Sequence, residues 1–280
     1  NSMGLAAAAT LPFANNAAIA SAQAAPLAPD PPELDVILTD HGFAIAQPLL
    51  AGRYRAVVSN VGTSTDSHSA LGKIPDKVTD EQYQAWLDSE DGETDALKFE
   101  DIAFVGMPDW PAPGGQTSGI IDLDPGRYFL FDPFDARGHR TIRVGGTMST
   151  VSEPASDLTV TLHEMAIDLP DTALTSKPMR WKIENTGGMS HEVAIIPRSP
   201  DFTEDDLKIV FTLPEDATPP PGVPEFVYQP VTAIGILAPK HTSWLDVHLQ
   251  PGAYIAICAL PFTTGYPHAM DGMYRFFEVK

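Results

Sequence analysis

The chain has 280 residues and a formal net charge of −20, with 43% hydrophobic and 19% charged residues. So large an acidic excess excludes nucleic acid and anionic lipid headgroups as partners, because both repel it. It suits a basic protein or a cation, and it equally suits a surface acidified for solubility. No run of ~18 apolar residues occurs, so the sequence predicts no membrane span. The 27 prolines and 21 glycines favour short strands joined by turns over long helices.

The N-terminal segment 1–30 has the composition of an export signal. Residues 4–28 are rich in alanine and uncharged, and Ala22-Gln23-Ala24 resembles a small-residue cleavage site. The sequence therefore predicts an extracytoplasmic protein, which is periplasmic, envelope-associated or secreted. A basic region before the apolar stretch is missing and Pro12 interrupts it, so the alternative is an N-terminal arm that packs on another surface.

The first half begins with two short strands. Alternating apolar residues predict strand structure over 35–45 and 54–60, and the second stretch ends at an asparagine followed by a glycine turn. Thr79 is a candidate N-cap for a short helix over 80–87 in an acidic insertion. A Pro-Gly turn then leads into an apolar and aromatic strand that ends at Asp132. This half is therefore predicted to be all-β outside the insertion.

The second half repeats this order. Strands over 157–167 and 180–185 match the first two, and a second capped short helix follows Thr203. A Pro-Gly turn again leads into an apolar strand, which ends at Cys258. Histidines stand at matching points of the two halves: His68 with His191, and His139 with His268.

This internal repeat predicts the domain organisation. A stretch rich in Gly, Ser and Thr over 145–156 is the expected linker. The predicted fold is all-β: two tandem Greek-key β-sandwich domains over residues 31–148 and 155–280, with short helices in the insertions.

The second half also carries a His, Cys, His and Met in the order of a known metal site. Three segments resemble the plastocyanin- and azurin-like cupredoxins: Glu184-Asn-Thr-Gly-Gly-Met-Ser-His191, Pro251-Gly-Ala-Tyr-Ile-Ala-Ile-Cys258 and Pro267-His268-Ala-Met-Asp-Gly-Met273. The resemblance covers roughly residues 157–280. It implies one copper in a type 1 site with His191, Cys258, His268 and Met273 as ligands. Such a His₂Cys set with a weak axial thioether suits copper that cycles between Cu(I) and Cu(II).

Two features keep alternatives open. Nine residues separate Cys258 from His268, whereas two to four are usual in the family that the sequence resembles. Met270 is a rival axial ligand to Met273. Taken singly, a histidine before an apolar strand, a lone cysteine and a methionine are each more typical of core packing than of metal binding.

The first half lacks a thiolate at the matching position. Asp132 stands where the repeat has Cys258, so this domain is predicted to hold no blue-copper centre. His68, Asp132 and His139 leave a 2-His-1-carboxylate site for a harder metal as an alternative to simple loss of an ancestral site.

The sequence argues against catalysis. None of the eight histidines forms a His-X-His pair, and Cys258 is flanked by Ile257 and Ala259 rather than by histidine. The sequence motifs that join the copper sites of multicopper oxidases and nitrite reductases are therefore missing. The leading hypothesis is electron transfer or copper carriage, with a basic redox protein or an assembly subunit as partner. The rival hypothesis is a metal-free structural or interaction module of an envelope or multisubunit assembly.

Overall fold

The computed structural model describes residues 31–65, 68–89, 94–133, 135–148, 151–170, 174–213, 219–261 and 266–280, without the side chains of 135–137. The segment 1–30, with its predicted export signal, lies outside the described residues. Among the described residues, no helix is long and apolar enough to cross a membrane.

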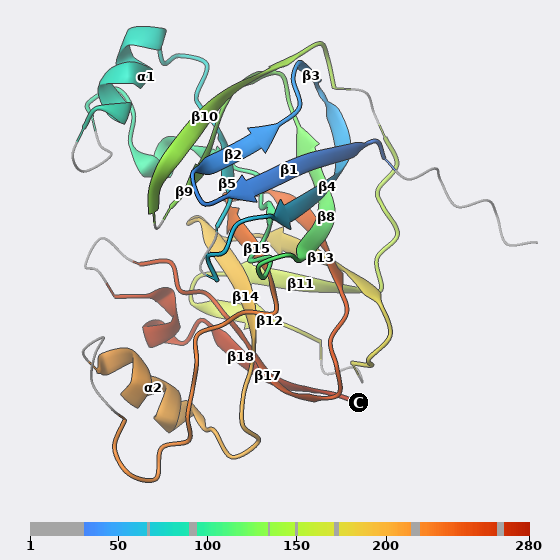
Figure 1. The fold of residues 1–280 in the computed structure, drawn as a ribbon, viewed down its shortest axis with the longest axis vertical. Coiled ribbons are helices and arrows are strands. Elements are labelled where there is room, and N and C mark those ends of the chain that lie inside the picture. Colours follow the sequence, from blue (N-terminus) through green and yellow to red (C-terminus); the bar gives the residue numbers. More distant parts are fainter. Residues whose placement is uncertain are drawn as a thin grey trace, which may run out of the picture.

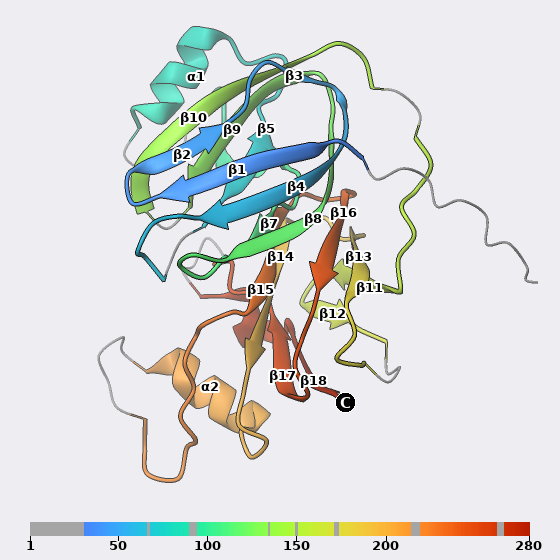
Figure 2. The ribbon, with the colours of Figure 1, turned by 45° about the vertical axis from the view of Figure 1, so that its right-hand side comes forward.

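The largest sheet, here called sheet A, contains eight strands drawn from both halves of the chain (Figures 1 and 2). Its order is β12 (Ala166–Asp168), β11 (Leu158–His163), β13 (Met179–Asn185), β16 (Thr242–Val247), β8 (Gln116–Leu123), β4 (Gly52–Asn60), β1 (Glu33–Thr39) and β2 (Gly42–Ile45).

Two five-stranded sheets face sheet A. Sheet B contains β3 (Leu49–Leu50), β10 (Asp135–Gly145), β9 (Gly126–Asp132), β5 (Ala70–Lys73) and β6 (Ala103–Phe104). Sheet C contains β18 (Tyr274–Val279), β17 (Gly252–Ile257), β14 (His191–Pro197), β15 (Thr232–Leu237) and β7 (Pro108–Asp109). Four of the five strands of sheet C come from the second half, and β7 comes from the first.

Alternating apolar residues build the two cores. On β1, Leu34, Val36 and Leu38 are buried and face Leu71 and Leu130 of sheet B. In the second core, sheet A contributes residues such as Trp181 and Ile183, and sheet C contributes residues such as Val193, Ile195 and Ala256. The two facing-sheet pairs confirm the predicted all-β fold of β-sandwich type.

The strands predicted over 35–45 and 157–167 are each a pair of strands instead. Residues 40–41 form a tight turn between β1 and β2, which are paired from Val36↔Ile45 to Thr39↔Gly42. The second turn includes Met165, whose φ is 57°, between β11 and β12. In both stretches the apolar alternation changes phase at the turn, between Leu38 and Phe43 and between Leu162 and Met165, and the prediction of one continuous stretch overlooked this signal.

The two predicted helices are confirmed. Thr79 caps α1 (Asp80–Leu87) and Thr203 caps α2 (Glu204–Thr212), each through a reciprocal capping box. Trp86 of α1 packs against Phe129 on the outer face of sheet B, and Leu207 of α2 joins the cluster on the outer face of sheet C. The insertions therefore cover sheet faces that would otherwise expose apolar side chains. Two short 3₁₀ helices, η1 (Phe99–Asp101) and η2 (His268–Asp271), complete the fold.

The two halves share hydrogen-bonded strands. β8 of the first half pairs with β16 of the second, and β7 pairs with β15. The hydroxyl of Ser243 on β16 is fully buried and donates towards the carbonyl oxygens of Gly106 and Ile120, at 2.7 and 3.1 Å. The junction is therefore built from backbone pairing as well as from side-chain packing.

Candidate metal centre

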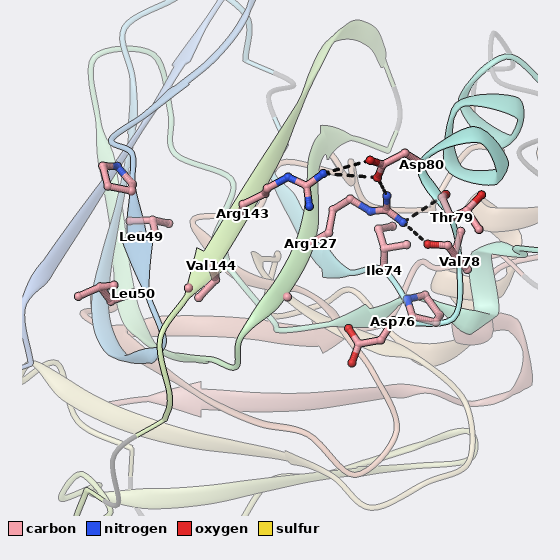
Figure 3. Close-up of a pocket in the computed structure, with 14 residues that line it drawn as sticks. Leu49, Leu50, Ile74, Asp76, Val78, Thr79, Asp80, Arg127, Arg143 and Val144 are labelled. Atoms are coloured by element: carbon pink, nitrogen blue, oxygen red, sulfur yellow. Dashed lines mark hydrogen bonds and ion pairs between the residues drawn. The ribbon is translucent and has the colours of Figure 1, made fainter.

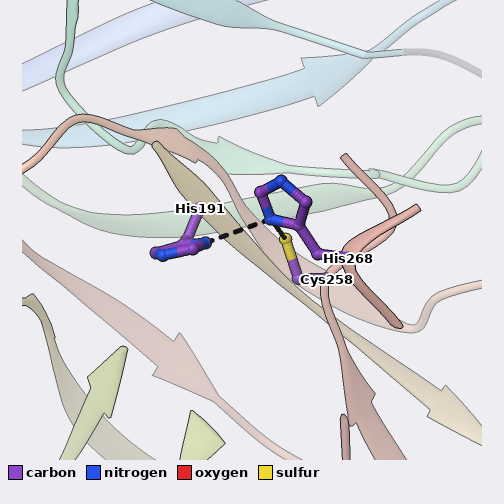
Figure 4. Close-up of side chains that lie close together, drawn as sticks. All are labelled: His191, Cys258 and His268. Carbon is purple, nitrogen blue, oxygen red and sulfur yellow. Dashed lines mark hydrogen bonds between the residues drawn. The ribbon is translucent and has the colours of Figure 1, made fainter. Parts of the chain in front are cut away.

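Three of the four predicted ligands converge in the second half (Figure 4). The ligand atoms of His191, Cys258 and His268 lie within 4.8 Å of one another. His191 Nδ1 is 3.2 Å from His268 Nδ1, and Cys258 Sγ is 3.5 Å from the same nitrogen. All three residues are buried. Two imidazoles and one thiol therefore point towards a common position.

Strand pairing brings the first two of these residues together. His191 is the first residue of β14, and Cys258 directly follows β17. The two strands are antiparallel neighbours, with Ala194 opposite Ile257, so the start of one strand lies beside the end of the other.

The long loop after Cys258 is closed at its base. Pro261 and Pro267 are bridge partners, and the amide of His268 donates to the carbonyl oxygen of Leu260 at 2.9 Å. The amide of Ala269 donates to the carbonyl oxygen of Cys258 at 3.0 Å. The extra residues therefore do not separate Cys258 from His268, although nine residues lie between them.

Met273 is tied to this cluster through its backbone. Its carbonyl oxygen accepts from the amide of Cys258 at 3.0 Å, and its amide donates to the carbonyl oxygen of His268 at 3.2 Å. The Met273 side chain is fully buried in the same core as Cys258, whereas Met270 is half-buried on η2. Met273 is thus the more deeply buried of the two methionines, and its role as a ligand stays a prediction.

Burial keeps the cluster uncharged. It lowers the pKa of His191 to about 4, helped by the neighbouring His268, and it lowers the pKa of His268 as well. Burial, reinforced by the charge of Glu192, raises the pKa of the Cys258 thiol. Near neutral pH the centre therefore has two neutral imidazoles, the form that binds metal, and a thiol that would lose its proton to a bound cation.

Glu192 contacts both the cysteine and the residue that follows it, and sequence reasoning missed it. Its amide donates to Cys258 Sγ at 3.5 Å, and its Oε1 accepts from the amide of Ala259 at 2.9 Å. Burial raises the pKa of Glu192 to about 7; Asp109 acts in the same direction, while the Ala259 amide and His68 oppose it. The sequence offered one signal for this residue: Glu192 is a charged residue directly before the apolar run 193–196.

The turn before His191 is held by two side chains. Asn185 donates to the carbonyl oxygens of Met189 and Leu237, at 2.8 and 2.9 Å. Glu164 accepts from the amides of Gly188 and Met189, and these bonds, the Gly188 bond first, lower its pKa. Both side chains therefore support the backbone that leads into β14.

The alternative metal site in the first half is wrong. His139 is exposed, and its ring lies 5.5 Å from that of Phe129. His68 is buried, with its amide 3.3 Å from Asp132 Oδ2 and its Nδ1 3.3 Å from Asp109 Oδ2. Within the described ranges, His68, Asp132 and His139 form no metal-binding group.

The donor set of the second half fits a copper ion. Nitrogen and sulfur ligands about 2.0–2.3 Å from one ion in a trigonal arrangement lie roughly 3.5–3.8 Å apart. The distances of 3.2 and 3.5 Å are within a few tenths of an ångström of that range. The His191 Nε2 atom is buried and has no hydrogen-bond partner among the described residues. A neutral imidazole that binds metal through Nδ1 carries its proton on Nε2.

A surface pocket lies elsewhere, over the first half of the chain (Figure 3). It has a volume of about 750 Å³ and is lined by Leu49, Leu50, Arg127, Arg143 and Asp80, among others. Asp80 pairs with both arginines, so their charge is balanced within the protein. The metal cluster, in contrast, is enclosed by protein.

No family model matches the chain, and no curated protein matches it. Among solved structures, reduced auracyanin from the photosynthetic bacterium Roseiflexus castenholzii is 20% identical, covers 44% of this chain and 95% of its own, and has a TM-score of 0.30. Reduced rusticyanin is 17% identical over 45% of this chain and 81% of its own, with a TM-score of 0.26.

A longer similarity involves a multi-copper oxidase from Pediococcus acidilactici. It is 10% identical, covers 89% of this chain and 59% of its own, and has a TM-score of 0.26. At these identities and scores, the case for a metal centre rests on the residues of this chain.

Proposed function

We propose that the protein binds one copper ion through His191, Cys258 and His268, with Met273 as a weak axial ligand, and that it transfers electrons. The observation that carries this proposal is the convergence of two imidazole nitrogens and one thiol sulfur in a buried position. A copper ion bound there would supply one-electron chemistry between Cu(I) and Cu(II).

The protein residues would prepare the site for that chemistry. A buried, hydrogen-bonded cluster keeps its geometry when the charge of the bound ion changes, which lowers the cost of reorganisation. Burial also excludes water and additional ligands, so no open coordination position is offered to a substrate. Electron transfer is therefore favoured over catalysis, and copper carriage is the alternative that uses the same ligands.

The wider organisation belongs to the same proposal. We infer two tandem cupredoxin-like Greek-key domains over 31–148 and 155–280, with the copper in the second. Matching contacts in the two halves support this inference: Tyr128 donates to the carbonyl oxygen of Asp124 at 3.0 Å, and Tyr254 donates to that of Gln250 at 2.9 Å. The alanine-rich segment supports an extracytoplasmic location, and the net charge of −20 suits a basic redox partner.

The first test is the visible absorption spectrum of the full chain after addition of Cu(II), with metal analysis. We expect one copper per chain and a strong thiolate-to-copper absorption band. The Cys258→Ser variant should lack the band because a serine hydroxyl provides no thiolate-to-Cu(II) charge transfer. The His139→Ala variant, altered at an exposed histidine, should retain it.

A protein that stays colourless and does not retain copper would exclude the metal centre and favour the structural or interaction module. Electron transfer and carriage are separated by a second measurement. An electron-transfer protein keeps copper in both oxidation states and shows a reversible potential, whereas a carrier releases Cu(I) readily to a competing chelator.

A further inference from the structure

Buried polar side chains from both halves of the chain lie near the metal cluster. His68, Asp109 and Glu192 are each at least nine-tenths buried. Asp109 lies on β7 of the first half, and Glu192 lies on β14 of the second. Since β7, β15 and β14 are consecutive neighbours in sheet C, the two carboxylates are separated by one strand, β15.

A glycine on β15 makes room for the Asp109 side chain. Gly235 stands between Ile234 and Ile236, whose side chains both belong to the second core, so position 235 faces the opposite side of sheet C. Asp109 Oδ2 lies 3.4 Å from the point that a Cβ at position 235 would occupy. The Asp109 carboxylate therefore lies against β15 at Gly235.

Asp109 is fixed in this position by the first half. Its Oδ1 accepts from the amide of Ser69 at 2.8 Å, and its Oδ2 is 3.3 Å from His68 Nδ1. The His68 ring is packed edge-on against Trp110 at 3.9 Å. Asp132 adds a further buried carboxylate beside the amide of His68. Glu192 on β14 is thus one strand away from a buried carboxylate–imidazole pair.

We propose that the first half takes part in the metal centre, because Asp109, oriented by His68, acts through Glu192 on the position and electronic environment of Cys258. The inference rests on the proposed copper site. Asp109 and His68 are positioning residues, since both are proposed to act through Glu192 and not to bind the ion. Groups around a metal ligand tune the bound metal, and in a water-excluded region a carboxylate charge is weakly screened.

The test compares the reduction potential of copper-loaded wild type with that of Asp109→Asn. The amide keeps the shape of the side chain and removes one negative charge. We expect the potential to rise, because less negative charge near the ion favours Cu(I) over Cu(II). Asp76→Asn removes the same charge from an exposed position in the first half, and we expect no measurable shift.

A double-mutant cycle tests whether Asp109 acts on the copper site through Glu192. If Asp109 acts through Glu192, the shift caused by Asp109→Asn becomes smaller in a Glu192→Gln background. Equal potentials for Asp109→Asn and Asp76→Asn would overturn the proposal. A shift that is undiminished in the Glu192→Gln background would also overturn it.

A second readout uses the metal-free protein and stays valid if no copper binds. Cys258 is buried, so its reaction rate with a thiol reagent reports local opening of the site. We expect His68→Gln and Asp109→Asn to react several-fold faster than wild type and Asp76→Asn to be unchanged. Failure of wild type to bind copper would refute the proposed function alone. Unchanged thiol reaction rates in both His68→Gln and Asp109→Asn would refute the influence of the first half on Cys258.

Discussion

Asn60 and Asn185 make the same three hydrogen bonds in the two halves of the chain. Each side-chain nitrogen donates to the carbonyl oxygen four residues ahead and to one distant carbonyl oxygen. Each side-chain oxygen accepts from the amide two residues ahead. Both side chains are 1% exposed. The two residues are a matched pair, but only Asn185 supports the turn that leads into His191.

We therefore expect Asn60→Ala and Asn185→Ala to destabilise the protein and to differ in metal binding. Each variant should lose at least ~1 kcal/mol of unfolding free energy, because buried backbone groups lose their partners. Only Asn185→Ala should weaken copper binding, by ~10–100-fold. Urea unfolding and titration against a copper chelator measure the two effects. Equal copper affinities in the two variants would contradict the assignment of the site.

The two methionines can be told apart by exchange for leucine. Leucine approximates the volume of methionine without the sulfur, so both variants should fold with a loss below about 1.5 kcal/mol. Met273→Leu should shift the reduction potential and the position of the visible band, since axial ligation tunes both. Met270→Leu should leave them unchanged. The opposite pattern would make Met270 the axial ligand.

Glu164 gives a pH-dependent contribution to folding. Its pKa is lowered below the ordinary value of 4.5, chiefly by the bond from the Gly188 amide. A lowered carboxyl pKa stabilises the folded state above pH 4.5 and loses this effect as the pH falls through the folded-state pKa. Glu164→Gln should therefore lower the unfolding free energy of the metal-free protein at neutral pH and converge with wild type in acid.

The effect should be small, because the carboxylate is mostly exposed to solvent. Chemical unfolding at several pH values measures it, with the exposed Glu225→Gln as the control. A difference between Glu164→Gln and wild type that persists unchanged below the folded-state pKa would show that the charge is not responsible.

Gly119 permits the pairing of β8 with β16. A Cβ at this position would lie 2.1 Å from the carbonyl oxygen of Trp244, so Gly119→Ala must displace one strand. We expect this variant to lose several kcal/mol of stability or to fail to fold. Gly52→Ala on neighbouring β4 meets only an atom of Tyr54 at 3.9 Å and is the control. Thermal unfolding of the two proteins tests the difference.

Local patterns were sufficient to predict much of the fold and site. The Pro-Gly turn and apolar run placed Cys258 at a strand end, and Thr79 and Thr203 were correctly predicted as helix caps. These features depend on neighbours within a few residues. The candidate ligands His191 and His268, in contrast, were implied by the resemblance of the second half to cupredoxins and not by a local pattern.

Contacts between distant segments were not predictable in the same way. The packing of Asp109 across Gly235 depends on the pairing of β7 with β15, which no short pattern specifies. The bridge between Pro261 and Pro267 brings Cys258 near His268 despite the loop length that had argued against it. The exposure of His139 reflects its position on β10, whereas its place in the repeat suggested a site residue.

The shared strands also bear on how the chain can be divided. A fragment comprising only the second half would leave the sides of β15 and β16 that now pair with β7 and β8 without partners. Unpaired strand edges are templates for intermolecular association. The two halves are thus expected to resist separation: the isolated second half would tend to self-associate, and the first half acts as its built-in edge protector.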